Sequence, residues 1–121
     1  MSHRYIVKPR KNELAQVRKK LFAALIEGDH LFATQLVDQV IFDRWEPSCV
    51  YVNVIGHCMT EIGAMWHAGK LSIPEEHRAT QIALRLIARA QDSYIGDQRV
   101  GLRAIVASVE GDKHLIGGLT F

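Results

Sequence analysis

Near the end of the chain, a short polar segment carries residues that suit metal chemistry. It contains Asp112, His114 and Gly117 in the pattern Asp-x-His-x-x-Gly. The imidazole of His114 is a good metal ligand, and Asp112 can accept the hydrogen on its other ring nitrogen, which fixes the tautomer and makes the ligand more basic. Three fixed residues are a weak signal by themselves, because a polar loop in which Asp112 caps a helix would look the same.

A second group of candidate residues lies in the middle of the chain. Trp66, His67, Glu76 and His77 form the pattern Trp-His-x8-Glu-His. Trp66 offers a flat apolar surface to a ligand, and Glu76 can accept a hydrogen bond from a hydroxyl group such as that of a ribose. We expect His77 to be neutral, because the first turn of a helix disfavours added positive charge. The alternative makes Trp66 a core anchor and the other three ordinary surface or half-buried residues.

Four amphipathic helices are expected to position these residues. Apolar residues recur at three- and four-residue steps over 12–27, from 29 towards the break at Pro47, over 47–69, and from 72 to near 96. Short connections between them predict an antiparallel four-helix bundle. The positions expected to be buried are Leu14, Val17, Leu21, Ala24, Leu25, Ala33, Leu36, Val37, Val40, Ile41, Tyr51, Val54, Ile55, Cys58, Ile62, Met65, Trp66, Ala83, Leu86, Ile87 and Ala90.

Local signals mark the helix boundaries. Gly28 is expected to end the first helix and Asp29 to cap the second. Ser72 and Glu75 have the spacing of a capping box, and Pro74 falls in the first helical turn, where its missing N–H costs nothing. The fourth helix, which carries Glu76, should therefore begin close to Ser72.

The pattern changes after the fourth helix. Residues 104–109 are almost continuously apolar, as in a strand covered on both faces. We expect a tail over 1–10, a mainly α bundle over 11–96, and over 97–121 the first strand and loop of an α/β domain of the flavodoxin or Rossmann kind, truncated early. His114 would then follow the carboxyl end of a strand, where such folds bind ligands.

Composition excludes several classes of function. The 121 residues carry 15 Lys plus Arg against 13 Asp plus Glu, so the charge gives no reason to expect nucleic acid or an anionic membrane as partner. The early basic residues, Arg18 among them, are interpreted as a solvated tail and helix face. Cys49 and Cys58 are expected to be reduced, which predicts a cytoplasmic protein. The sequence contains neither a catalytic triad nor a P-loop, so self-contained catalysis is not expected.

Taken with its strand, the C-terminal motif resembles that of a known family, the cobalamin-binding modules of the methionine synthase type. The resemblance implies that His114 is the lower axial ligand of cobalt and that Gly117 lies beside the nucleotide tail of the cofactor. The pattern from Trp66 to His77 is similar to the helical cap of adenosylcobalamin-dependent photoreceptors and transcriptional regulators. In that family Trp, Glu and His residues surround the adenosyl group, which implies this role for Trp66, Glu76 and His77. His67 would be able to bind cobalt after illumination.

The resemblance implies a cobalamin-binding sensory or regulatory module, and not an enzyme. The expected cofactor is adenosylcobalamin, with methylcobalamin as the other form considered, and the expected output is a change in homo-oligomeric state. Residues 1–11 offer no DNA-binding domain, so DNA would be reached only through a domain or partner absent from this chain, and no membrane partner is expected. Two alternatives stay open: a corrinoid shuttle protein of a methyltransferase system, and a helical interaction domain without a cofactor.

Overall fold

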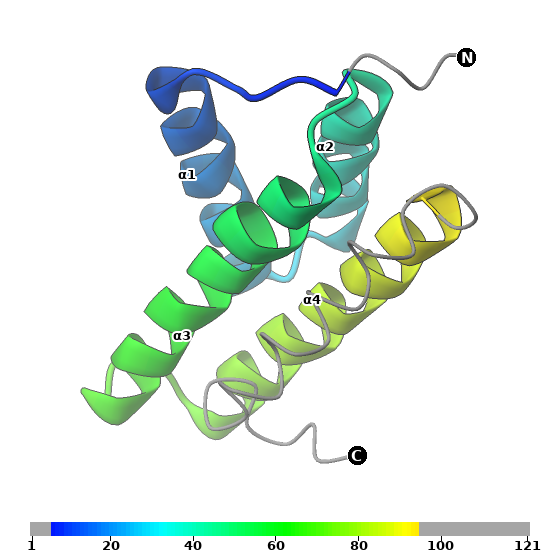
Figure 1. The fold of residues 1–121 in the computed structure, drawn as a ribbon. Coiled ribbons are helices and arrows are strands. Elements are labelled where there is room, and N and C mark those ends of the chain that lie inside the picture. The colour runs from blue at the N-terminus through cyan, green and yellow to red at the C-terminus, as the bar shows by residue number, and fades with distance from the viewer. Residues whose placement is uncertain (1–5, 95–121) are drawn as a thin grey trace.

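The computed structural model describes residues 6–94, which form a bundle of helices. The elements are α1 (Lys11–Glu27), α2 (His30–Phe42), η1 (Cys49–Gly56), α3 (His57–His67) and α4 (Ile73–Tyr94). Successive helices run in opposite directions, with η1 and α3 forming one continuous rod (Figure 1). The predicted mainly α bundle is confirmed. The predicted strand at 104–109 and the segment with Asp112, His114 and Gly117 lie outside the described residues.

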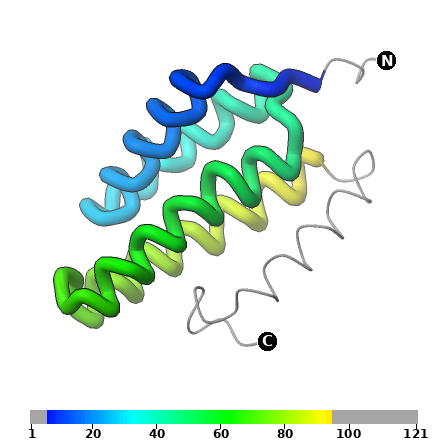
Figure 2. Tube along the Cα trace, turned by 60° about the vertical axis from the view of Figure 1, so that its left-hand side comes forward, coloured from blue at the N-terminus to red at the C-terminus, as the bar shows by residue number. Residues whose placement is uncertain are grey.

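The bundle has two layers. The helices α1 and α2 form one layer, and the rod of η1 and α3 lies beside α4 in the other (Figure 2). α1 contacts all the other elements, and α2 contacts α4 and η1. The two helices that carry the candidate residues, α3 and α4, are therefore neighbours within one layer. Within residues 6–94, no helix is both long and apolar enough to cross a lipid bilayer.

The turn between α1 and α2 follows the predicted signals. Gly28 has φ 76° and ψ 22°, a left-handed conformation that residues with a Cβ rarely adopt. Asp29 then caps α2, because its Oδ1 accepts a hydrogen bond from the amide of Phe32 at 3.1 Å. The predictions for Gly28 and Asp29 are confirmed.

The start of α4 is fixed by the predicted capping box. The amide of Ser72 donates to Oε1 of Glu75 at 2.9 Å, and the amide of Glu75 donates to Oγ of Ser72 at 3.2 Å. Hydrogen bonds from Ser72 to the carboxylate lower the pKa of Glu75, since they favour the charged form. The box fixes where α4 begins and so where Glu76 and His77 lie on it.

The third predicted helix differs from the observed one in two ways. Its first part, η1, is a π-helix, and only the part from His57 onward is an α-helix. The helix also ends at His67, two residues earlier than predicted, in a turn where Gly69 has φ 73°. Sequence periodicity did not indicate the π geometry, because one wide segment shifts the helical pattern by only one residue.

The core contains nearly all the residues that periodicity selected. Leu21, Val37, Ile55, Ile62 and Leu86 are at most 1 % exposed. Both cysteines, Cys49 and Cys58, are buried and free, as expected. Other predicted core positions are buried or packed against the core: Leu14, Val17, Ala24, Leu25, Ala33, Leu36, Val40, Ile41, Tyr51, Val54, Met65, Ala83, Ile87 and Ala90.

The prediction that Trp66 lies on the buried side of its helix was wrong, because its side chain is 39 % exposed. It stands in the last turn of α3, next to a turn whose residues from Ala68 to Lys70 are exposed. Leu71, which follows that turn and is 7 % exposed, belongs to the core instead.

The segment before α1 is tied to the link between α2 and η1. Val7 and Trp45 form an isolated parallel bridge. The amide of Val7 donates to the carbonyl of Arg44 at 2.7 Å, and the amide of Glu46 donates to that of Val7 at 3.2 Å. Trp45 is 6 % exposed, so this bridge closes one end of the core.

Candidate functional site

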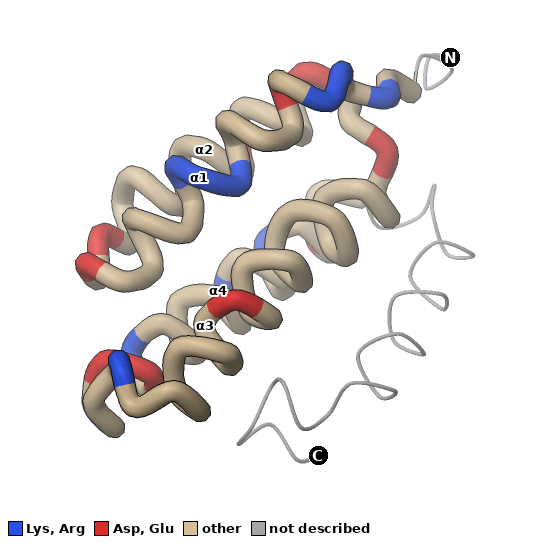
Figure 3. The backbone as a smooth tube through the Cα atoms, turned by 90° about the vertical axis from the view of Figure 1, so that its left-hand side faces the viewer, with Lys and Arg blue, Asp and Glu red and all other residues tan. Residues whose placement is uncertain are grey.

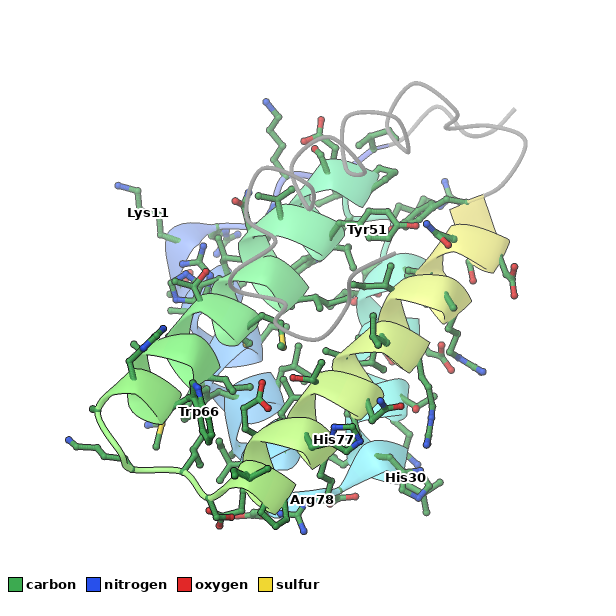
Figure 4. The ribbon with its side chains drawn as sticks, turned by 90° about the horizontal axis from the view of Figure 1, so that it is seen from below. Lys11, His30, Tyr51, Trp66, His77 and Arg78 are labelled. Atoms are coloured by element: carbon green, nitrogen blue, oxygen red, sulfur yellow. The ribbon has the colours of Figure 1, made fainter. Side chains whose placement is uncertain are left out.

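Trp66 and His77 lie on the face formed by α3 and α4. Figure 4 looks onto this face and shows Trp66 at the end of α3 and His77 near the start of α4. His77 is exposed and Trp66 is 39 % exposed. Because α3 ends where α4 begins, the structure brings both side chains to the same end of this helix pair.

Glu76 lies beside His77 on α4 but in a different environment. It is half-buried, and its Oε2 accepts a hydrogen bond from Oγ1 of Thr80 at 3.1 Å. Thr80 is only 6 % exposed, so a rigid part of the helix holds one oxygen of the carboxylate. A carboxylate can accept roughly four hydrogen bonds, so Glu76 keeps capacity for a ligand.

The four candidate residues of the bundle do not all point the same way: Glu76 is half-buried, and the other three are exposed. Neighbouring residues on a helix point about 100° apart. Glu76 therefore turns towards the side of the buried Thr80, and His77 turns to the surface. His67 is exposed in the last turn of α3, about 100° around the helix from Trp66.

The face formed by α3 and α4 carries little charge. From Pro47 to His67 the only Asp, Glu, Lys or Arg residue is Glu61, and Figure 3 shows this rod as mostly tan. Positions 81, 84, 88 and 91, which follow His77 at helical spacing, hold Gln, Leu, Ala and Gln. By contrast, Lys and Arg are concentrated on α1 and the segment before it (Figure 3). The face therefore suits a large, flat and neutral ligand better than an anion.

Metal ligation is not explained by the bundle alone. Among residues 6–94, no three side chains of His, Cys, Asp and Glu come together as a metal site. His67 stands without such a group, and His114 lies outside the described residues.

Sequence reasoning missed two contacts, one at this site and one at the rod of η1 and α3. Thr80 holds Glu76, and the spacing of four residues between them on one helix could have indicated it. Arg18 was interpreted as part of a solvated face, but it is half-buried and its Nε donates to the carbonyl of Asn53 at 2.6 Å. That bond joins residues 35 apart in the chain, so no local pattern could reveal it.

The B12 binding domain family matches residues 17–91, more than half of the chain. This chain belongs to the B12 binding domain family. The match includes all of η1 and α3 and most of α1 and α4, so it contains Trp66, His67, Glu76 and His77. The predicted cobalamin-binding module is confirmed at this level. No curated protein is similar enough to the chain to be matched.

Proposed function

We propose that this chain is a cobalamin-binding sensory module that responds to light through adenosylcobalamin. In this proposal the face formed by α3 and α4 covers the upper side of the corrin ring, and His114 binds cobalt from below. The chain acts as a sensor and not as an enzyme. Its output is a change in homo-oligomeric state, and any effect on DNA passes through a domain or partner outside the chain.

The exposure of Trp66 carries this proposal. Burying an aromatic side chain is strongly favourable, so an exposed Trp beside a well-packed core suggests a binding surface. Its flat ring remains available to a ligand. It is 39 % exposed, on an almost uncharged helix within the region matched by the B12 binding domain family. A corrin ring is broad, flat and edged by neutral amides, which matches this surface in shape and charge.

Glu76 fits the upper ligand of adenosylcobalamin. Its carboxylate accepts from Thr80 and has capacity for a ribose hydroxyl group. His77 supplies an exposed imidazole near it, and His67, next to Trp66 in the chain, is the proposed second cobalt ligand on this face. When bound, adenosylcobalamin supplies a carbon–cobalt bond that light can break.

The lower side of the site rests on the sequence pattern. His114 is the proposed axial ligand, Asp112 would orient its ring through the second nitrogen, and Gly117 would let the backbone approach the nucleotide tail. The first of these roles is directly testable, because His114→Ala removes the proposed cobalt ligand.

The decisive experiment mixes the full chain with adenosylcobalamin in the dark and follows both components. Gel filtration and sedimentation are run before and after green light, since free adenosylcobalamin also changes colour in light. We expect cobalamin to elute with the protein in the dark, and light to change the sedimentation coefficient. His114→Ala should lose the cofactor, whereas His30→Ala, on the first residue of α2, should keep it (Figure 4).

Two outcomes would overturn the proposal in different ways. Firm retention of methylcobalamin, with sedimentation of the adenosylcobalamin complex unchanged by light, would favour a corrinoid shuttle protein. Failure to retain any cobalamin, in the presence of a folded bundle, would favour a helical interaction domain without a cofactor.

A further inference from the structure

The junction between η1 and α3 has an unusual hydrogen-bond pattern. The amide of His57 donates to the carbonyls of Val52 and Val54, five and three residues earlier. In an α-helix it would donate to the residue four positions earlier, which is Asn53. The carbonyl of Asn53 accepts instead from Nε of Arg18, on α1, at 2.6 Å. A side chain from another helix thus occupies the carbonyl that the α-helical pattern would use.

The same arginine is held to this junction at a second point. Sγ of Cys58 donates to the backbone carbonyl of Arg18 at 3.4 Å, and Cys58 has no exposed surface. The guanidinium is also close enough to both thiols, at Cys49 and Cys58, to oppose the rise in pKa that burial causes there. Residue 18 therefore contacts η1 near its end and α3 at its start.

Gly56 makes the wide turn possible from inside the rod. A Cβ at this position would be 3.1 Å from the carbonyl oxygen of Tyr51, five residues earlier. That separation is tighter than almost all real contacts of a Cβ atom, so a larger residue would press on the π turn. The absence of a Cβ at Gly56 and the hydrogen bond from Arg18 thus favour the same geometry.

The π segment determines how α3 is rotated. Moving a helix by one residue in register turns it by about 100° and shifts it by about 1.5 Å. With the π geometry, the buried side of η1, which contains Val54 and Ile55, is continuous with the buried side of α3, which contains Cys58 and Ile62. An α-helical junction would turn α3 relative to η1 and would move Trp66 away from its present position on the face.

We infer that Arg18 is a positioning residue, which holds the junction in its π geometry and thereby fixes the rotation at which α3 presents Trp66. Its importance for the cofactor rests on the proposed function, but its effect on α3 does not. The contact that matters is the hydrogen bond from the side chain of residue 18 to the carbonyl of Asn53.

Three substitutions test whether position 18 needs a donor while a long side chain is kept. Arg18→Met keeps a long apolar stem and removes the donor, and Arg18→Lys keeps a donor. Lys19→Met is the matched control, because Lys19 is the exposed neighbour on α1. Gly56→Ala tests the geometry independently, since it leaves Arg18 in place. If Arg18→Met fails to fold, Gly56→Ala still tests the geometry of the junction.

The first measurement uses NMR couplings across hydrogen bonds in the full chain. We expect the amide of His57 to couple to the carbonyl of Val52 in the unaltered protein, in Arg18→Lys and in Lys19→Met. In Arg18→Met and Gly56→Ala the coupling should shift to Asn53, and the indole signal of Trp66 should shift with it. An unchanged pattern at His57 in folded Arg18→Met would overturn the inference, whatever happens to the cofactor. If Arg18→Met does not fold, an unchanged pattern in Gly56→Ala would overturn it.

The second measurement is retention of adenosylcobalamin in the dark. We expect loss of retention in Arg18→Met and rescue by Arg18→Lys. A shifted coupling with full retention would show that α3 is repositioned without consequence for the cofactor, and would overturn the part of the inference that concerns Trp66. If the unaltered chain retains no cobalamin, the proposed function fails, and the NMR result still decides the role of Arg18.

Discussion

The guanidinium group of Arg78 lies directly against Gly28, so that a Cβ atom on Gly28 would be 2.5 Å from Nε of Arg78. Nη2 of the same arginine donates to the carbonyl of Ile26 at 2.6 Å. The turn between α1 and α2 is thus held by a side chain from α4, and Figure 4 shows Arg78 at that end of the bundle.

Gly28→Ala should destabilise the protein for two separate reasons. The left-handed backbone at φ 76° would cost roughly 1 kcal/mol with a Cβ present. Displacing the flexible, exposed side chain of Arg78 would add roughly 0.5 to 1 kcal/mol, mainly through the loss of its hydrogen bond to Ile26. Gly69→Ala is the matched control, because Gly69 has φ 73° but nothing within 4 Å of its Cβ position.

Urea unfolding of the two glycine variants measures the contribution of the contact with Arg78. We expect the midpoint to fall for both and to fall further for Gly28→Ala. Equal losses would mean that Arg78 moves aside without cost, which would contradict its role as the side chain that holds the turn.

Tyr94, at the C-terminal end of α4, and Tyr51, on η1, should respond differently to the loss of their hydroxyl groups. The hydroxyl of Tyr94 donates to the carbonyl of Trp45 at 2.8 Å. That of Tyr51 is buried and, within the part of the chain that the structure describes, has no hydrogen-bond partner. Their rings are 6.3 Å apart, and Figure 4 shows Tyr51 near the last turns of α4.

Tyr94→Phe should therefore cost about 1 kcal/mol, because it leaves a carbonyl without its donor. Tyr51→Phe should leave stability unchanged or raise it by up to about 1 kcal/mol, because it removes a polar group that is buried without compensation. Chemical denaturation of both variants tests this difference. A loss of stability in Tyr51→Phe equal to that in Tyr94→Phe would show that the Tyr51 hydroxyl has a partner after all.

These contrasts show what the sequence can and cannot predict. Gly28, Asp29 and the pair Ser72 and Glu75 act within four residues of their partners, so local spacing was sufficient to place the helix ends. Periodicity likewise identified the buried faces, since a helix exposes or buries positions at regular steps.

Contacts between distant helices could not be predicted in this way. Arg89 makes two hydrogen bonds to Asp38, at 2.7 and 2.9 Å, across 51 residues of chain. Arg18 donates to the carbonyl of Asn53 across 35 residues, a contact that no local pattern indicates. For the candidate site, the predicted turn before α4 was sufficient to place Trp66 and Glu76 at one end of the bundle. It did not predict that the side chain of Trp66 is exposed.

Stability should fall at alkaline pH because of the buried thiol groups. Burial raises the pKa of Cys58 from its ordinary value of 9.0 to about 12, with a smaller contribution from Glu61. Between these values the unfolded chain loses the thiol proton while the folded chain keeps it. The folded state then binds more protons, so the free energy of unfolding decreases as pH rises, by up to about 1.4 kcal/mol per pH unit.

Between pH 9 and 10 the thiols ionise first, and Tyr51 and Tyr94, whose pKa values burial also raises, contribute in the same direction as the pH approaches 10. Cys49, whose pKa is also raised by burial, contributes in the same direction. Cys58→Ala should lower stability at neutral pH through the cavity it leaves, yet should show a shallower decline over this window. The same slope in both proteins, measured by urea unfolding at several pH values, would contradict the assignment to Cys58.

Thr80 offers a final test that links the core to the candidate site. Its hydroxyl group donates to Glu76 at 3.1 Å and is almost fully buried, so Thr80→Val keeps the shape of the side chain and removes the donor. We expect a loss of about 1 kcal/mol in stability, because a hydrogen bond to a carboxylate is lost while the carboxylate can still turn towards solvent. Thr60→Val is the matched control, since Thr60 is exposed on α3 and donates only to the backbone of its own helix, at Gly56.

The more informative readout is the form of cobalamin that each variant retains. If Thr80 orients Glu76 for a ribose hydroxyl, Thr80→Val should weaken retention of adenosylcobalamin and leave that of methylcobalamin unchanged, because methylcobalamin has no ribose on its upper side. Thr60→Val should affect neither. Equal weakening of both forms would mean that Thr80 supports the bundle in general, since a carboxylate that recognises one upper ligand has nothing to bind in the other.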